Sequence, residues 1–170
     1  MPQPRALSRL NGATGIVFRD CDRQLDCAGF GPVWMRQPAV AYEVTETILA
    51  ADEKRRLCRL HAFVVMPNHV HLLLTPLRPL CEVTKWIKGA SARRANQLLQ
   101  RTGMPFWQDE SFDHWVRSQE EFAKIERYIA ENPVRGGLVD EPSLWPWSST
   151  GHHRLKARST GQAQLIIRTV

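Results

Sequence analysis

The chain has 170 residues, which is enough for one domain with a hydrophobic core and short for two. Hydrophobic residues make up 43% and charged residues 24% of the sequence, a globular balance that excludes a largely disordered chain. The formal net charge of +6 favours a polyanionic partner such as nucleic acid, because each neutralised phosphate releases a condensed counterion.

The cysteines and the hydropathy pattern bear on the compartment. Cys21, Cys27, Cys58 and Cys81 are irregularly spaced and form no C-x-x-C pair, which indicates free thiols rather than a disulfide framework or a structural zinc site. No apolar run approaches the ~18 residues of a membrane span, and the first residues lack the apolar region of a signal peptide. We therefore expect a cytoplasmic protein with no contact to a membrane.

The first residues of the chain are predicted to lie outside the folded domain. Residues 1–12 are polar and contain proline, which is typical of a flexible N-terminal arm. The domain is expected to span residues 13–150, with a first strand at the short apolar run of residues 16–18. This arrangement places one short strand ahead of the first helix.

The first helix is predicted to begin at Pro38, since proline is favourable in the first turn. Val40, Val44 and Ile48 recur at helical spacing and define its apolar side. Tyr42 is expected among these core-facing residues.

A β-hairpin is predicted next, where two apolar runs flank a Pro-Asn turn. Residues 61–66 and 69–75 are short and rich in valine, phenylalanine and leucine. Side chains alternate along a strand, so His69 and His71 point to the same face, at a distance that one divalent cation can bridge. On spacing alone, a pair of half-exposed polar residues is the more common meaning of this pattern.

The second helix is predicted at residues 81–100, ending before Gly103. Its apolar residues Val83, Ile87 and Leu98 are expected to face the sheet. Its basic residues are spread around the remaining surface: Lys85, Lys88, Arg93, Arg94 and Arg101. Composition alone is equally compatible with a solvated helix surface and with a surface that follows the phosphates of DNA.

The third helix follows an aromatic extended segment at residues 106–117. Ser118 and Glu121 form a capping-box signature at its start, and Pro133 is predicted to end it. Three residues make its apolar stripe: Phe122, Ile125 and Ile129. Residues 151–170 are predicted to form a basic C-terminal tail.

The order of these elements predicts an α+β fold with a mostly antiparallel sheet. Five sequence segments in the same order resemble the REP-associated tyrosine transposases, relatives of the insertion-sequence transposases of the HUH class. They are residues 64–76 (VVMPNHVHLLLTP), 88–96 (KGASARRAN), 106–117 (FWQDESFDHWVR), 127–139 (RYIAENPVRGGLV) and 145–149 (WPWSS). The resemblance implies a ferredoxin-like sheet with helices packed on it, of the HUH endonuclease type, and a central strand that carries both histidines. The predicted first strand is shorter than the strand usual in that family.

The resemblance implies that Tyr128 is the nucleophile of this protein. Without it, a tyrosine at the margin of the apolar stripe would more commonly pack its ring at the rim and leave its hydroxyl in water. His69 and His71 would hold a divalent metal, Mg²⁺ or Mn²⁺, which needs an oxygen donor as well. Asn132, four residues after Tyr128 and on the same face of the helix, is the candidate for that oxygen. An asparagine before a proline also serves simply to end a helix, and both roles can coexist.

The function implied by the resemblance is that of a metal-dependent endonuclease and strand transferase acting on single-stranded or hairpin DNA through a 5′-phosphotyrosine intermediate. Lys85, Lys88, Arg93 and Arg94 are then expected to bind DNA. The protein is expected to be a monomer or a homodimer. A protein that binds DNA but has lost catalysis is the alternative, motivated by the short first strand. A structural zinc protein is disfavoured because no further Cys or His pair completes four ligands.

Overall fold

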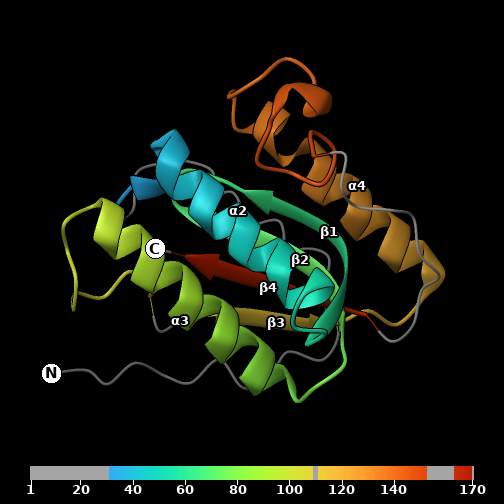
Figure 1. Cartoon of the computed structure of the whole chain (residues 1–170). Coiled ribbons are helices and arrows are strands. Elements are labelled where there is room, and N and C mark those ends of the chain that lie inside the picture. Colours follow the sequence, from blue (N-terminus) through green and yellow to red (C-terminus); the bar gives the residue numbers. More distant parts are fainter. Residues whose placement is uncertain (1–30, 109–110, 153–162, 170) are drawn as a thin grey trace, which may run out of the picture.

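The computed structural model describes residues 31–108, 111–152 and 163–169. The predicted N-terminal arm and the predicted strand at residues 16–18 lie outside the described residues. The described residues form an α+β fold, as predicted, in which a four-stranded antiparallel sheet has the strand order β1-β2-β4-β3 (Figure 1). The strands are β1 (Cys58–Val65), β2 (His69–Pro76), β3 (Ser111–Trp115) and β4 (Gln164–Thr169).

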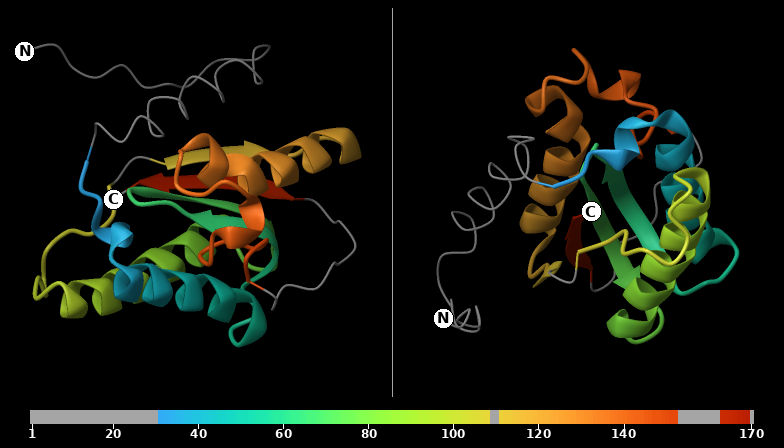
Figure 2. Two further views of the ribbon diagram at one scale, coloured as in Figure 1. Left: turned by 90° about the horizontal axis from the view of Figure 1, so that it is seen from above. Right: turned by 90° about the vertical axis from the view of Figure 1, so that its left-hand side faces the viewer.

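In the described part of the chain, three helices cover the sheet on both faces. Helices α2 and α3 lie on one face and α4 lies on the other (Figure 2). Their bounds are α2 (Pro38–Glu53), α3 (Leu80–Leu98) and α4 (Gln119–Arg135), and the short 3-10 turns are η1 (Trp34–Arg36) and η2 (Pro142–Leu144). No helix in the described part of the chain is long and apolar enough to cross a membrane.

The predicted hairpin of β1 and β2 is confirmed. The two strands pair antiparallel, with Val65 opposite Val70 next to the turn. A bulge at His61 inserts one extra residue, so that Leu60 faces α2 and α3 whereas Ala62 faces α4. The bulge therefore sets which side chains of β1 enter each of the two cores.

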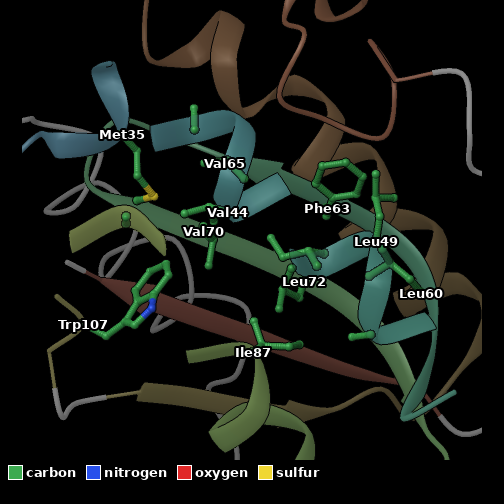
Figure 3. Close-up of a cluster of buried hydrophobic side chains, with 14 of the residues drawn as sticks. Met35, Val44, Leu49, Leu60, Phe63, Val65, Val70, Leu72, Ile87 and Trp107 are labelled. Atoms are coloured by element: carbon green, nitrogen blue, oxygen red, sulfur yellow. The ribbon is translucent and has the colours of Figure 1, made fainter. Parts of the chain in front are cut away.

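The larger core lies between the sheet and the pair α2 and α3 (Figure 3). Val70 and Leu72 of β2 point into it, and both side chains are almost fully buried. Val44 of α2 and Ile87 of α3 meet them there, as the helical spacing predicts. Because Val70 and Leu72 occupy this face, the alternate residues of β2 must face α4.

Helix α4 begins as predicted. Ser118 is its N-cap and accepts a hydrogen bond from the Glu121 N–H at 3.1 Å. Phe122, Ile125 and Ile129 face the sheet and build the second core with Ala62 and Leu73. The helix does not end at Pro133 but continues to Arg135, because a proline in the last turn removes one backbone donor without stopping the chain from completing that turn.

Two apolar residues that were expected to face the core lie on the surface instead. Tyr42 is 51% exposed, because it lies on the side of α2 opposite Val40 and Val44. Leu98, in the last turn of α3, is 49% exposed, and Ala95 occupies the buried position one turn before it.

The segment that was predicted to be a basic tail contributes a strand to the middle of the sheet. Strand β4 pairs antiparallel with β2 on one side and with β3 on the other. Thr169 lies opposite His69, and Ile167 lies opposite His71. The predicted domain boundary at residue 150 is therefore corrected, since the sheet is completed by residues beyond it.

Deleting residues 164–170 is expected to abolish cooperative folding, because it leaves the backbone groups of β2 without partners along one edge. Thermal unfolding followed by circular dichroism checks this prediction. If the segment were a tail outside the domain, the deletion would leave the Tm unchanged and would weaken only the binding of DNA.

Candidate active site

The two histidines of β2 lie side by side on the face covered by α4. His69 and His71 are both 0% exposed, and their ring centroids are 4.7 Å apart with the planes perpendicular. The predicted orientation on a common face is confirmed. Complete burial excludes the alternative of two half-exposed polar residues.

Burial keeps both imidazoles neutral. Desolvation lowers the pKa of His69 to about 4. The pKa of His71 lies well below its ordinary value, first because of burial and second because of the neighbouring His69. A neutral imidazole has a nitrogen lone pair, which is the form that binds a metal ion.

Tyr128 projects from α4 onto these histidines. Its ring centroid is 5.8 Å from that of His71, with the two rings nearly perpendicular. The residue is 9% exposed, so it lies deeper than the rim position that its place beside the apolar stripe suggests. Arg135, two helical turns further on, holds its guanidinium carbon 4.9 Å from the Tyr128 ring centroid and pairs with Glu131 at 2.7 Å.

Asn132 completes this layer from the next turn of α4. It is fully buried, and its Nδ2–H donates to His71 Nε2 over a long 3.5 Å. Its Oδ1 is buried and has no hydrogen-bond partner in the described part of the chain. A buried amide oxygen without a donor is costly, and a cation next to the histidines would satisfy it. In this arrangement the Nδ2–H occupies the lone pair of His71 Nε2, so the two imidazoles and the amide oxygen would fit a divalent ion once the amide turns its oxygen towards the histidines.

Within residues 31–108, 111–152 and 163–169, no group of three or more His, Cys, Asp and Glu side chains could hold a metal. Among the described residues, the Asn132 amide is the candidate for the third protein ligand of a metal at the histidine pair, and further positions would be open to oxygen atoms of water or phosphate.

Two neighbours of the site, Asn68 and Arg135, were not predicted from the sequence to have a functional role. The hairpin pattern assigns Asn68 only to the turn, yet its Oδ1 lies 2.7 Å from His69 Nδ1. Arg135 belongs to no predicted site, although it contacts the Tyr128 ring. It lies seven residues after Tyr128, and this spacing, which puts two side chains on one helix face, is the sequence signal that could have predicted the contact.

The basic residues predicted to bind DNA lie on the other side of the sheet. Helix α3 packs with α2, across the sheet from α4 (Figure 2). Lys88 donates to the Gln108 carbonyl at 2.8 Å, and Arg94 pairs with Glu43 of α2 at 3.3 Å, whereas Lys85 and Arg93 are exposed. The structure therefore does not bring these side chains to the histidines. A single-stranded DNA bound to α3 would have to pass round an edge of the sheet to reach them.

Comparison with known proteins places the site in a family context. The sequence model of the family described as "Transposase IS200 like" matches residues 35–132, a range that contains His69, His71, Tyr128 and Asn132. REP-associated tyrosine transposase of Escherichia coli (strain K12) is 27% identical over 118 residues, which cover 69% of this chain and 68% of that protein. Putative REP-associated tyrosine transposase of Haemophilus influenzae (strain ATCC 51907 / DSM 11121 / KW20 / Rd) is 28% identical over 107 residues, covering 56% of this chain and 60% of that protein. No solved structure matches the chain significantly.

The stability of the metal-free protein is expected to fall as the pH is lowered from 6.5 towards 4. In this window the unfolded chain binds protons at residues 69 and 71, whereas the folded protein keeps both rings neutral, so acid favours unfolding. Each histidine should contribute about 1 kcal/mol per pH unit. Denaturant unfolding in the presence of a chelator measures the slope. The double variant His69→Gln/His71→Gln should show a flatter dependence, and an equal slope in the variant would contradict the assignment.

Proposed function

The chain belongs to the IS200-like transposase family, whose sequence model matches more than half of its length, and we propose that it is a metal-dependent single-stranded DNA endonuclease and strand transferase. The observation that supports this proposal most directly is the contact between Tyr128 and His71 beneath α4. A nucleophile, two neutral imidazoles and a buried amide oxygen meet in one layer of a single chain. Because one chain supplies all four groups, the site suits either a monomer or a homodimer.

Tyr128 is assigned the role of nucleophile. Its phenolic oxygen attacks the scissile phosphorus, the bond to the 3′ oxygen breaks, and the phenolic proton leaves as the 3′ oxygen gains one. The product is a 5′-phosphotyrosine and a free 3′-OH. A phenol, with an ordinary pKa of about 10, is a better leaving group than an alcohol, so the bond can be reversed onto a new 3′-OH. That reversibility suits strand transfer rather than hydrolysis.

His69, His71 and Asn132 are the residues that would hold the divalent ion, Mg²⁺ or Mn²⁺. When bound, the ion supplies Lewis-acid polarisation of the scissile phosphate and a means of orienting it. The neutral state of both imidazoles favours such binding, because no proton has to be displaced from the coordinating nitrogen at pH 7. The Asn132 side chain also contacts His71 from α4, so it orients that imidazole before any ligand arrives.

Access to this site depends on α4. Both imidazoles are fully buried and the Tyr128 ring covers His71, so a phosphate reaches them only after the Tyr128 side chain or the helix shifts. This closed arrangement is also the observation that favours the alternative function, a DNA-binding protein without turnover. The preference for hairpin DNA rests on the family resemblance alone, not on the geometry of the site.

Tyr128→Phe is expected to eliminate both strand cleavage and the covalent protein–DNA adduct, because it removes the attacking oxygen and keeps the buried ring. Incubation with single-stranded hairpin DNA and Mg²⁺ or Mn²⁺, followed by a denaturing gel, measures both. The matched control is Tyr42→Phe, which changes the other tyrosine of the chain on the exposed side of α2 and should behave as wild type.

The same gel separates the two candidate functions. An adduct that persists in Tyr128→Phe would refute the assignment of the nucleophile. Wild-type protein that binds the DNA but forms no adduct with either metal would instead support the DNA-binding alternative.

The α3 surface is proposed to bind DNA mainly through charge. Replacing Arg93 and Arg94 by alanine should weaken binding of single-stranded DNA and reduce the slope of log K against log salt by about 0.7 for each phosphate that the protein no longer neutralises. Fluorescence anisotropy over a salt series measures this slope. The control Lys54→Ala/Lys124→Ala removes the same charge from the C-cap of α2 and from α4, and it should leave the slope close to wild type. Equal effects of the two double variants would remove α3 as the DNA path.

A further inference from the structure

The turn that joins β1 and β2 contributes a side chain to the histidine pair. Asn68 Oδ1 lies 2.7 Å from His69 Nδ1, and Asn68 itself is 4% exposed. We infer that Asn68 is a positioning residue, which fixes the proton of His69 on Nδ1 and presents the lone pair of Nε2 to the site. This role rests on the proposed function, because it concerns the same candidate metal ligand, His69.

The chemical reason lies in the two nitrogen atoms of the imidazole ring. A neutral imidazole has one N–H donor and one acceptor nitrogen, and the hydrogen bond at one nitrogen decides the state of the other. An amide oxygen accepts and cannot donate, so at 2.7 Å it places the proton on Nδ1. The Nε2 atom of His69, which is buried, is then the nitrogen able to bind a cation.

The backbone holds Asn68 in place from two directions. The Met66 N–H donates to the His69 carbonyl at 2.8 Å and closes the turn. The Met35 N–H, in η1, donates to the Pro67 carbonyl at 3.1 Å and ties the turn to a distant part of the chain. With the backbone fixed on both sides and the side chain buried, the amide has little freedom to leave His69.

The two histidines are therefore oriented by different elements. His69 is set by the hairpin turn through Asn68, whereas His71 touches Asn132 of α4. A shift of α4 that admits DNA would release the contact at His71 and leave the contact at His69 intact. Asn68 thus keeps His69 in the tautomer that can bind a cation, both with α4 in place and with α4 shifted.

Long-range ¹H–¹⁵N NMR of the histidine side chains in metal-free protein tests the inference, because the ¹⁵N shifts of the two ring nitrogens reveal which one is protonated. His69→Gln identifies the signal. Wild type and Asn68→Asp, which retains an acceptor oxygen, should show His69 protonated on Nδ1. Asn68→Ala should shift His69 towards the Nε2-protonated form. Asn96→Ala is the matched control, since Asn96 is also a buried asparagine but donates to the Met104 carbonyl and should leave the tautomer unchanged.

Mn²⁺ binding followed by electron paramagnetic resonance gives a second readout that requires no DNA. Removal of the acceptor in Asn68→Ala should weaken Mn²⁺ binding about 10- to 100-fold, and Asn68→Asp should restore it. Wild-type His69 protonated on Nε2, or an unchanged tautomer in folded Asn68→Ala, would overturn the inference. The wild-type spectrum decides the matter even where Asn68→Ala fails to fold.

Failure of the inference and failure of the proposed function are distinguishable. Wild-type protein with His69 protonated on Nδ1 but without a DNA adduct would refute the endonuclease and keep the role of Asn68. An active enzyme with His69 protonated on Nε2 would refute the role of Asn68 and keep the endonuclease.

Discussion

The packing of α4 against one face of β2 is the contact on which the candidate site depends. Alternation along β2 sends Val70 and Leu72 into the core beneath α2 and α3, which leaves His69 and His71 facing α4. Helical spacing then places Tyr128 and Asn132 one turn apart on the face that meets them. Two periodicities, one of a strand and one of a helix, thereby bring four polar side chains together without a loop. Sites built on regular elements in this way are held more rigidly than sites on loops.

A layer of polar side chains inside an apolar core costs free energy of folding unless these side chains form hydrogen bonds with one another. The second core consists of residues such as Leu73 and Ile129, and the histidines remain neutral in it because charging them would require burying a charge. Asn68 and Asn132 each supply an amide to one imidazole. The Asn132 oxygen keeps no hydrogen-bond partner among the described residues, which is the kind of local cost that proteins retain at functional sites. We attribute this cost to a role in binding a cation.

Local patterns in the sequence predicted the parts of the fold that depend on local spacing. The shared face of the histidines and the buried stripe of α4 follow directly from strand and helix periods, and both were confirmed. Strand β4 was missed because its partners, β2 and β3, are distant in sequence and because basic residues precede it. The position of α3 across the sheet from the histidines was also beyond prediction, since periodicity shows which side of a helix is apolar but not which face of a sheet it covers. Tyr42 shows a related limit, because it lies close in sequence to Val40 and Val44 yet points away from them.

We propose that the layer between β2 and α4 is a divalent metal site next to Tyr128. Anomalous diffraction from crystals soaked in Mn²⁺ tests it most directly, because the signal locates the ion without reference to activity. We expect a single strong anomalous peak bordered by His69, His71 and the amide oxygen of Asn132. A peak elsewhere in the molecule, or none at this layer under saturating Mn²⁺, would contradict it.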